Sequence, residues 1–65
     1  MKYFIKSGTA ASEVTANGHT YFVTKIDLYF DPEELIEVNT VSAVLKFRKC
    51  GLTLEFLFTD VLAVN

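Results

Sequence analysis

The sequence of 65 residues is poor in the residues from which small domains build cross-links. It has one cysteine, Cys50, one histidine, His19, and no tryptophan. A single cysteine excludes an internal disulfide, and one cysteine with one distant histidine does not supply the four ligands of a structural zinc site. We therefore predict no metal and no cofactor. Because so short a chain buries only about 60% of its unfolded surface, we expect dense packing or self-association to stabilise it.

The chain also lacks a strong charge of either sign and a long hydrophobic run. Its net charge is −2, with acidic and basic residues interspersed, which disfavours electrostatic capture of nucleic acid or of an anionic membrane. Its longest apolar run, residues 61–64, is far shorter than a membrane-spanning helix. Residues 1–6 hold three apolar side chains between two lysines, too few for a signal peptide. The sequence thus predicts a cytosolic (cytoplasmic) protein without a membrane partner.

Glycine and proline are scarce, and the residues of a catalytic site are missing. Gly8, Gly18 and Gly51 are isolated from one another, which excludes a glycine-rich phosphate-binding loop. Neither Cys50 nor His19 has a partner suited to nucleophilic catalysis in its sequence neighbourhood. We interpret them as an incidental turn thiol and an exposed polar residue, and we predict that the protein is not an enzyme.

Apolar residues, in contrast, are abundant. They make up 51% of the chain and include six phenylalanines and three tyrosines. This is generous for the volume that 65 residues can enclose. Since large exposed apolar patches usually mark interfaces, the composition favours a homodimer or another homo-oligomer over a monomer.

Two runs near the C-terminus have the pattern of one β-hairpin. Apolar residues alternate along both: Val41, Ala43, Leu45 and Phe47 in the first, and Leu52, Leu54, Phe56 and Phe58 in the second. A turn at Cys50-Gly51 aligns the two apolar sets, and a slip by one residue would turn one set to the wrong face. The predicted pairs are Phe47 with Leu54, Leu45 with Phe56, Ala43 with Phe58, Lys46 with Glu55, and Arg48 with Thr53.

The rest of the chain also favours strands. Residues 2–6 read as a short strand, 7–12 as a loop or weak edge segment, and 19–30 as one long strand that bends or carries a bulge. Asn17-Gly18 predicts a hairpin turn that places Thr15 opposite Thr20 and Val14 opposite Tyr21. After a kink at Asp60, the apolar residues 61–64 either continue the sheet or dock on a partner.

Residues 31–47 allow two interpretations. Asp31-Pro32-Glu33-Glu34 is a helix-start signature, and the later spacing of apolar residues permits a helix over 32–47. The segment is rich in β-branched residues, however, and residues 41–47 match 52–58 as a strand. We prefer a helical turn at 32–36 followed by a strand over 37–48.

Residues 1–65 are accordingly predicted to form a single small β-domain. The expected fold is mainly β, an antiparallel meander sheet or half-barrel of four to five strands with one short helical turn near 32–36. The alternative is an α+β fold with a helix at 32–47.

The long strand predicted over 19–30 has a second face that is only half polar. Tyr21, Val23 and Tyr29 lie on it, and tyrosine is favoured at interfaces because it combines area with a polar tip. We predict that these residues bind a partner. The expected function is a cytosolic protein–protein interaction module that self-associates and binds or inhibits another protein.

Other functions are kept as alternatives. Lys46, Arg48 and Lys49 form the one basic cluster of the sequence and would serve a single-stranded nucleic-acid-binding sheet. A small-ligand sponge at a subunit interface is the third possibility. Asp27, Asp31, Glu33 and Glu34 form an acidic stretch near position 30. We do not interpret it as a metal site, because no glycine-turned ligand loop accompanies it and because Asp31, Glu33 and Glu34 are explained as helix-terminus partners.

Overall fold

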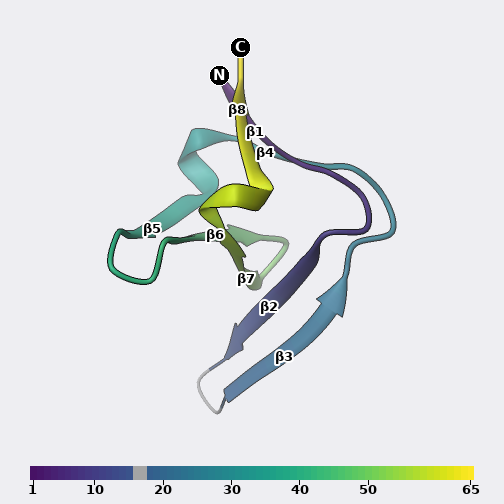
Figure 1. The fold of residues 1–65 in the computed structure, drawn as a ribbon, viewed down its shortest axis with the longest axis vertical. Coiled ribbons are helices and arrows are strands. Elements are labelled where there is room, and N and C mark those ends of the chain that lie inside the picture. Colours follow the sequence, from purple (N-terminus) through teal and green to yellow (C-terminus); the bar gives the residue numbers. More distant parts are fainter. Residues whose placement is uncertain (16–17) are drawn as a thin grey trace.

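The computed structural model describes residues 1–15 and 18–65 as a mainly β protein of two antiparallel sheets (Figure 1). The predicted fold class is confirmed. Two lone 3-10 turns, η1 Pro32–Glu34 and η2 Phe58–Asp60, are its helical elements. The strands are β1 Lys2–Ile5, β2 Ala10–Thr15, β3 Gly18–Val23, β4 Leu28–Phe30, β5 Leu35–Asn39, β6 Val44–Lys49, β7 Leu52–Leu57 and β8 Val61–Val64.

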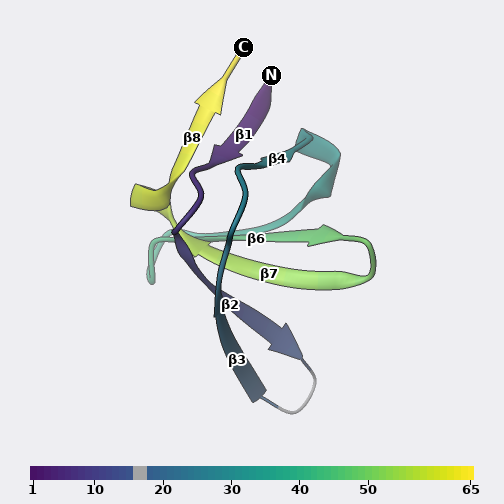
Figure 2. The same ribbon diagram turned by 90° about the vertical axis from the view of Figure 1, so that its right-hand side faces the viewer.

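The chain passes repeatedly from one sheet to the other. The small sheet has the strand order β4-β1-β8 and the large sheet the order β3-β2-β7-β6-β5. A meander is present over β5, β6 and β7, but the described chain has more strands than the four to five predicted and places them in two sheets. Figure 2 shows the small sheet above β6 and β7, with the β2–β3 hairpin projecting below.

The hairpin predicted near the C-terminus forms with the predicted register. Strands β6 and β7 pair Phe47 with Leu54, Leu45 with Phe56, and Lys46 with Glu55. The next predicted pair, Ala43 with Phe58, falls beyond the strand ends. A backbone hydrogen bond of 2.9 Å from the Phe58 amide to the Ala43 carbonyl still links these two residues.

The turn of this hairpin consists of Cys50 and Gly51, as predicted. Lys49 pairs with Leu52, so two residues connect the strands. Both have positive φ, 53° at Cys50 and 79° at Gly51. This is the backbone of the two-residue turns whose twist matches that of the flanking strands.

The continuous strand predicted over 37–48 is wrong, and so is the alternative helix over 32–47. The structure has two antiparallel strands, β5 and β6, joined by a turn. The Asn39 side chain makes this turn, because its Oδ1 accepts the backbone amides of Val41 and Ser42 at 3.0 Å each. An asparagine that bonds the chain two residues ahead reverses its direction. Val41 continues the apolar alternation but is 97% exposed.

The long strand predicted over 19–30 is also wrong, since it is divided into β3 and β4 of different sheets. Thr24 stands at the break and is buried. Its amide donates to the Thr9 carbonyl at 3.1 Å, and its hydroxyl lies 3.2 Å from the Thr9 carbonyl oxygen and 3.4 Å from that of Lys6. Nearby, the Ser7 amide donates to the Asp27 carboxylate at 2.9 Å. The two crossing segments, 6–9 and 24–27, thereby bind each other.

Strand β2 begins within the segment predicted as a loop or weak edge segment, but it lies inside the large sheet, between β3 and β7. Its pairing with β3 also differs from the prediction. Val14 pairs with His19, and Ser12 pairs with Tyr21. This register differs by two residues from the predicted one, a change that keeps every side chain on its face, so the apolar pattern does not distinguish them. The predicted Asn17-Gly18 turn includes Asn17, which lies outside the described residues.

The helical turn near 32–36 is present as η1. Asp31 directly precedes this turn, and its amide donates to the Glu34 side chain at 2.8 Å. A glutamate three residues after the first capping residue commonly accepts this hydrogen bond. The apolar C-terminal segment follows a turn that ends at Asp60, as expected. It forms β8, which pairs with β1 of the small sheet.

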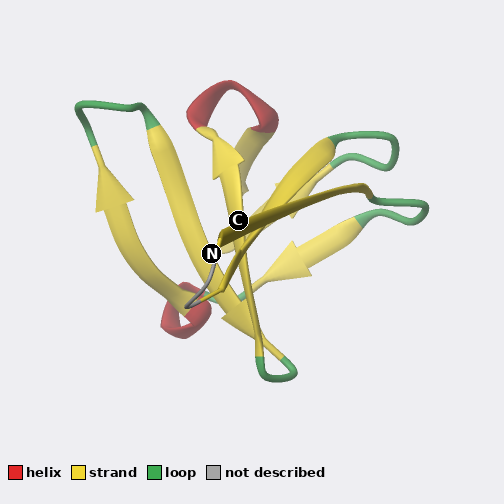
Figure 3. Cartoon of the chain, turned by 90° about the horizontal axis from the view of Figure 1, so that it is seen from below, coloured by secondary structure: helices red, strands yellow, loops and turns green. Residues whose placement is uncertain are grey.

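The core lies between the two sheets. Phe30 of the small sheet stacks on Phe47 of the large sheet with ring centroids 4.5 Å apart, and Phe56 lies 6.0 Å from Phe30. Ile5 and these three rings are fully buried. Figure 3 shows the strands converging toward the centre of the molecule, with the loops around its periphery. Such packing fixes the sheets against each other and leaves their outer strands at the surface.

Candidate functional site

The two open sheets end in four edge strands, which are the first candidates for a binding surface. They are β3 and β5 of the large sheet and β4 and β8 of the small one. An edge strand presents backbone N–H and C=O groups that can pair with another chain, and proteins protect such edges with charge, bulges, cover or short length. The four edges differ in this protection.

Three of the edges carry such features. In β5 the register shifts between Leu35 and Glu37, which marks a bulge, and Glu37 forms an ion pair of 3.6 Å with Lys46. Strand β4 has three residues, and the Lys49 ammonium donates to its Tyr29 carbonyl at 2.8 Å. Strand β8 has four residues. By length, charge or cover, each of these edges is a poor template for a further strand.

Strand β3 carries none of these features in the part of the chain that the structure describes. Its six residues, Gly18–Val23, include no lysine, arginine, aspartate, glutamate or proline. Its register with β2 is regular from Ala10 and Val23 to Thr15 and Gly18. A regular, neutral edge of this length is the most accessible strand-pairing site of the four.

The ladder between β2 and β3 determines which backbone groups of β3 point outward. Just beyond β3, the Thr24 amide donates to the Thr9 carbonyl, and the Thr24 carbonyl accepts the Gly8 amide at 2.7 Å. Both backbone groups of Thr24 thus face the β2 side. Because this orientation alternates along an antiparallel strand, the amides and carbonyls of Tyr21 and Val23 point away from β2, toward the free edge.

The predicted partner-binding residues do not lie on one strand face. Tyr21 and Val23 belong to β3, whereas Tyr29 belongs to β4 of the other sheet. All three side chains are exposed, Tyr21 by 76%. The structure therefore keeps Tyr21 and Val23 together beside the free edge and separates Tyr29 from them.

Tyr29 belongs to a second apolar surface on the outer face of the small sheet. It pairs with Phe4, which in turn pairs with Leu62. The rings of Phe4 and Tyr29 are 5.0 Å apart, and the side chains of Tyr29 and Leu62 are exposed. Sequence reasoning missed this row because it joins three strands that are distant in sequence.

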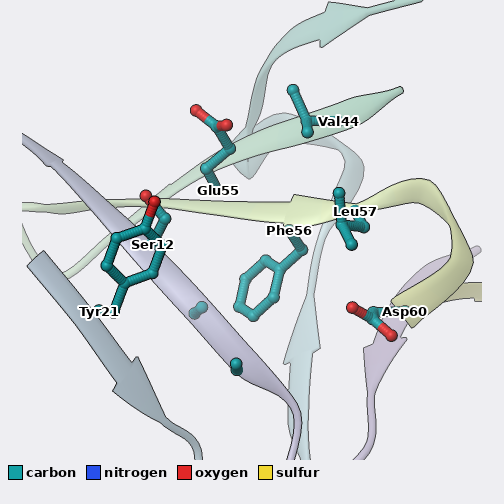
Figure 4. A pocket seen from close by; sticks show the side chains of 9 residues that line it. Ser12, Tyr21, Val44, Glu55, Phe56, Leu57 and Asp60 are labelled. Carbon is teal, nitrogen blue, oxygen red and sulfur yellow. The ribbon is translucent and has the colours of Figure 1, made fainter. Parts of the chain in front are cut away.

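A pocket of about 300 Å³ lies beside Tyr21, where β2 and β7 diverge. The two strands pair only where Ser12 meets Glu55 and Glu13 meets Leu54. Figure 4 shows Ser12, Tyr21 and Glu55 at one end of the pocket, with the Phe56 ring between them and Asp60. The pocket is thus lined by the carboxylates of Glu55 and Asp60, the hydroxyl groups of Ser12 and Tyr21, and the Phe56 ring. Such a lining favours a cationic or hydroxyl-bearing ligand group over an anion. Sequence reasoning missed Glu55 and Asp60 as pocket residues, because the divergence of two strands has no local signal.

A second pocket of about 380 Å³ opens between the sheets. It is lined by apolar side chains of both sheets and by Tyr3. Its lining residues are Tyr3, Val38, Leu45, Phe58, Val61 and Ala63. It continues the apolar surface of the core toward solvent.

The predicted basic cluster is divided between two faces of β6. Lys46 pairs with Glu37, while Lys49 reaches the core side, where its ammonium lies 3.9 Å from the Glu34 carboxylate and 5.3 Å from the Phe30 ring centroid. Arg48 is exposed. Since two of the three cations bind within the chain, the structure does not gather them into one surface for nucleic acid.

The other candidate residues are dispersed. Cys50 is a free, exposed thiol in its turn, and the His19 side chain lies outside what the structure describes. Asp31 forms an ion pair of 3.6 Å with Lys2. Within residues 1–15 and 18–65, no group of three metal-ligating side chains comes together.

Among the described residues, no helix has the length and apolar character needed to cross a membrane. Comparisons with protein-family models, with curated proteins and with solved structures found no match for this chain.

Proposed function

We propose that this chain is a small protein–protein interaction module that accepts an extended segment of another chain at the free edge of β3. One observation carries the proposal: β3 is the longest edge strand without charge, bulge or cover among the described residues. In strand addition, backbone hydrogen bonds supply affinity, and alternate side chains supply specificity.

The side chains beside this edge suit the same role. Tyr21 and Val23 are exposed on β3, next to the outward backbone groups. A strand added there would place its alternate side chains against them. Tyrosine contributes a large, rigid contact area and a hydroxyl group, which is why it is enriched at interfaces.

The proposal includes a non-catalytic role and a cytosolic location. Cys50 is a free, exposed thiol, which suits a reducing compartment. Binding at the edge of a sheet would also allow the chain to inhibit a partner by covering the segment that it pairs with.

Replacing Val23 by proline tests this function. Proline removes the outward amide of Val23 without removing a hydrogen bond to β2, and proline is tolerated in edge strands where the N–H faces solvent. Val23→Thr is the matched control, because it keeps the amide and the branched side chain. Each purified protein is used to capture binding proteins from a lysate of the cells that make it.

We expect the wild type and Val23→Thr to retain the same bound chain, whether another copy or a different protein, and Val23→Pro to lose it. Circular dichroism establishes that all three proteins are folded. Equal capture by a folded Val23→Pro variant would contradict strand addition at β3.

A further inference from the structure

We propose that the chain accepted at the β3 edge is a second copy of this protein, paired antiparallel about a two-fold axis at Tyr21. This inference rests on the function proposed above and names the partner. Joining the two five-stranded sheets in this way gives one continuous sheet across the dimer. A two-fold interface uses the same surface on both copies, so that surface must be complementary to itself.

Charge is the first reason to choose a second copy. The chain carries a net charge of −2, so two copies repel each other weakly overall, and an uncharged surface avoids adding to this repulsion. Strand β3 carries no charged residue, and therefore places no like charges opposite each other when it pairs with itself. The other edge of the large sheet carries Glu37, and a self-pairing of β5 would bring the Glu37 carboxylates of both copies toward the interface.

The orientation of the backbone selects the register. The outward groups belong to Tyr21, Val23 and, by the same alternation, His19. Antiparallel pairing centred on Tyr21 places Tyr21 opposite Tyr21 of the second copy and Val23 opposite His19. By the two-fold symmetry, His19 also lies opposite Val23 of the second copy, which makes three pairs. Each pair exchanges two hydrogen bonds, about six in total. Centring on Thr20 leaves two such pairs within β3, Tyr21 with His19 in each direction, and about four bonds.

The side chains at the centre support this register. Tyr21 is 76% exposed in the single chain, so pairing can cover much of its ring. Aromatic cross-strand pairs are among the stabilising pairs of antiparallel sheets. The paired segment is short, however, and buries less than the about 1,200 Å² of a standard interface. We therefore expect a dimer that dissociates on dilution, with a dissociation constant on the order of micromolar.

Charge reversal at Tyr21 tests the pairing. Tyr21→Lys and Tyr21→Glu each place like charges opposite each other across the two-fold axis. In sedimentation experiments, we expect each variant alone to dimerise at least about tenfold more weakly than the wild type, since the central tyrosine is lost as well. An equimolar mixture of the two should recover a heterodimer. Leu62→Lys, on the uncharged edge β8, is the matched control and should leave the dimer intact.

A cysteine cross-link tests the register independently, in a Cys50→Ser background. Residues opposite each other in a hydrogen-bonded pair have Cα atoms about 5.5 Å apart, within disulfide range. Tyr21→Cys should therefore form a cross-linked dimer on oxidation. Val23→Cys should not, because Val23 lies opposite His19 of the second copy. Cross-linking of Val23→Cys with none of Tyr21→Cys would overturn the register.

The outcomes separate this inference from the function on which it rests. A monomeric wild type at about millimolar concentration overturns the dimer, and so does a dimer that Leu62→Lys disrupts and Tyr21→Lys does not. If Val23→Pro still abolishes capture of a different protein in that case, strand addition stands without self-pairing. If the wild type is monomeric and Val23→Pro captures the same proteins as the wild type, both proposals fail.

Discussion

Phe47 packs against aromatic rings of the opposite sheet. It extends from β6, stacks on Phe30 of β4 at 4.5 Å and meets the Tyr3 ring of β1 at 5.3 Å. It is fully buried. The Phe47 ring therefore joins side chains from three strands and both sheets.

Removing this ring should abolish much of the stability of the domain. Phe47→Ala is expected to lower the free energy of unfolding by about 3–5 kcal/mol, the usual range for a buried phenylalanine. Since small domains are stable by only about 5–15 kcal/mol, a large unfolded population should result. Urea denaturation measures the change. Val41→Ala, at a position 97% exposed, should stay within about 0.5 kcal/mol of the wild type, and a similar loss in both variants would contradict this role of Phe47.

Thr24 is a buried polar residue whose hydroxyl joins the two crossing segments. Thr24→Val keeps the shape and removes the hydroxyl, while the carbonyls of Lys6 and Thr9 each keep a backbone amide donor. We therefore expect a loss of about 1 kcal/mol in unfolding free energy, at the low end for a buried hydrogen bond. Thr24→Ser keeps the donor and serves as the control. A Thr24→Val variant as stable as the wild type, with a loss only in Thr24→Ser, would show that the methyl group matters and the hydroxyl does not.

At the scale of single elements, the turn between β6 and β7 combines a favourable and an unfavourable residue. Gly51 accepts its φ of 79° without strain, but Cys50 holds a φ of 53°, which favours asparagine or glycine. Cys50→Asn should raise the free energy of unfolding by about 0.5–1 kcal/mol. Gly51→Ala should lower it, because the added Cβ is strained at positive φ although it meets open space. Thermal unfolding of both variants tests these two expectations. An unchanged or lower unfolding midpoint for Cys50→Asn would contradict the expected stabilisation.

Lys49 connects the end of β6 to the small sheet. Its ammonium donates to the Tyr29 carbonyl, lies close to the Glu34 carboxylate and approaches the Phe30 ring. Lys49→Met should cost about 1 kcal/mol, a modest value because the side chain is partly solvated. Arg48→Met, one residue earlier and on the exposed face, is the matched control. Chemical denaturation that finds the larger loss at Arg48 would contradict this assignment.

The elements that sequence patterns predicted correctly are those stabilised by local chemistry. Strands β6 and β7 pair in the predicted register because their alternation and their two-residue turn agree. The errors fall where tertiary contacts divide a regular pattern. Thr24 ends β3 by bonding to a segment about fifteen residues away, and no local signal announces it. The Asn39 turn does have a local signal, an asparagine before small polar residues, but the apolar Val41 concealed it.

The candidate site was predictable in part. Tyr21 and Val23 were identified from a half-polar strand face, and the structure places both on an edge strand. Tyr29 was assigned to the same face because β3 and β4 were read as one strand. Edge position itself is a property of the whole sheet, and strand order cannot be derived from the alternation of a single strand.

At the scale of the whole molecule, edge pairing links stability to concentration. A dimer that forms only from folded copies stabilises them by mass action, so the wild-type unfolding midpoint should rise with protein concentration. Tyr21→Lys, which dimerises more weakly, should show a midpoint that rises less over the same concentration range. Calorimetry over a hundredfold concentration range tests this, and a wild-type midpoint that stays constant would count against self-association.

Pairing of the outward backbone of β3 with another chain is tested most directly by residue-resolved amide hydrogen exchange over a dilution series. The Thr20 amide faces β2 and should be protected at every concentration. The amides of Tyr21 and Val23 should exchange rapidly in dilute protein and slow progressively as the protein associates. Rapid exchange of both amides at concentrations where sedimentation finds a dimer would contradict strand pairing at β3.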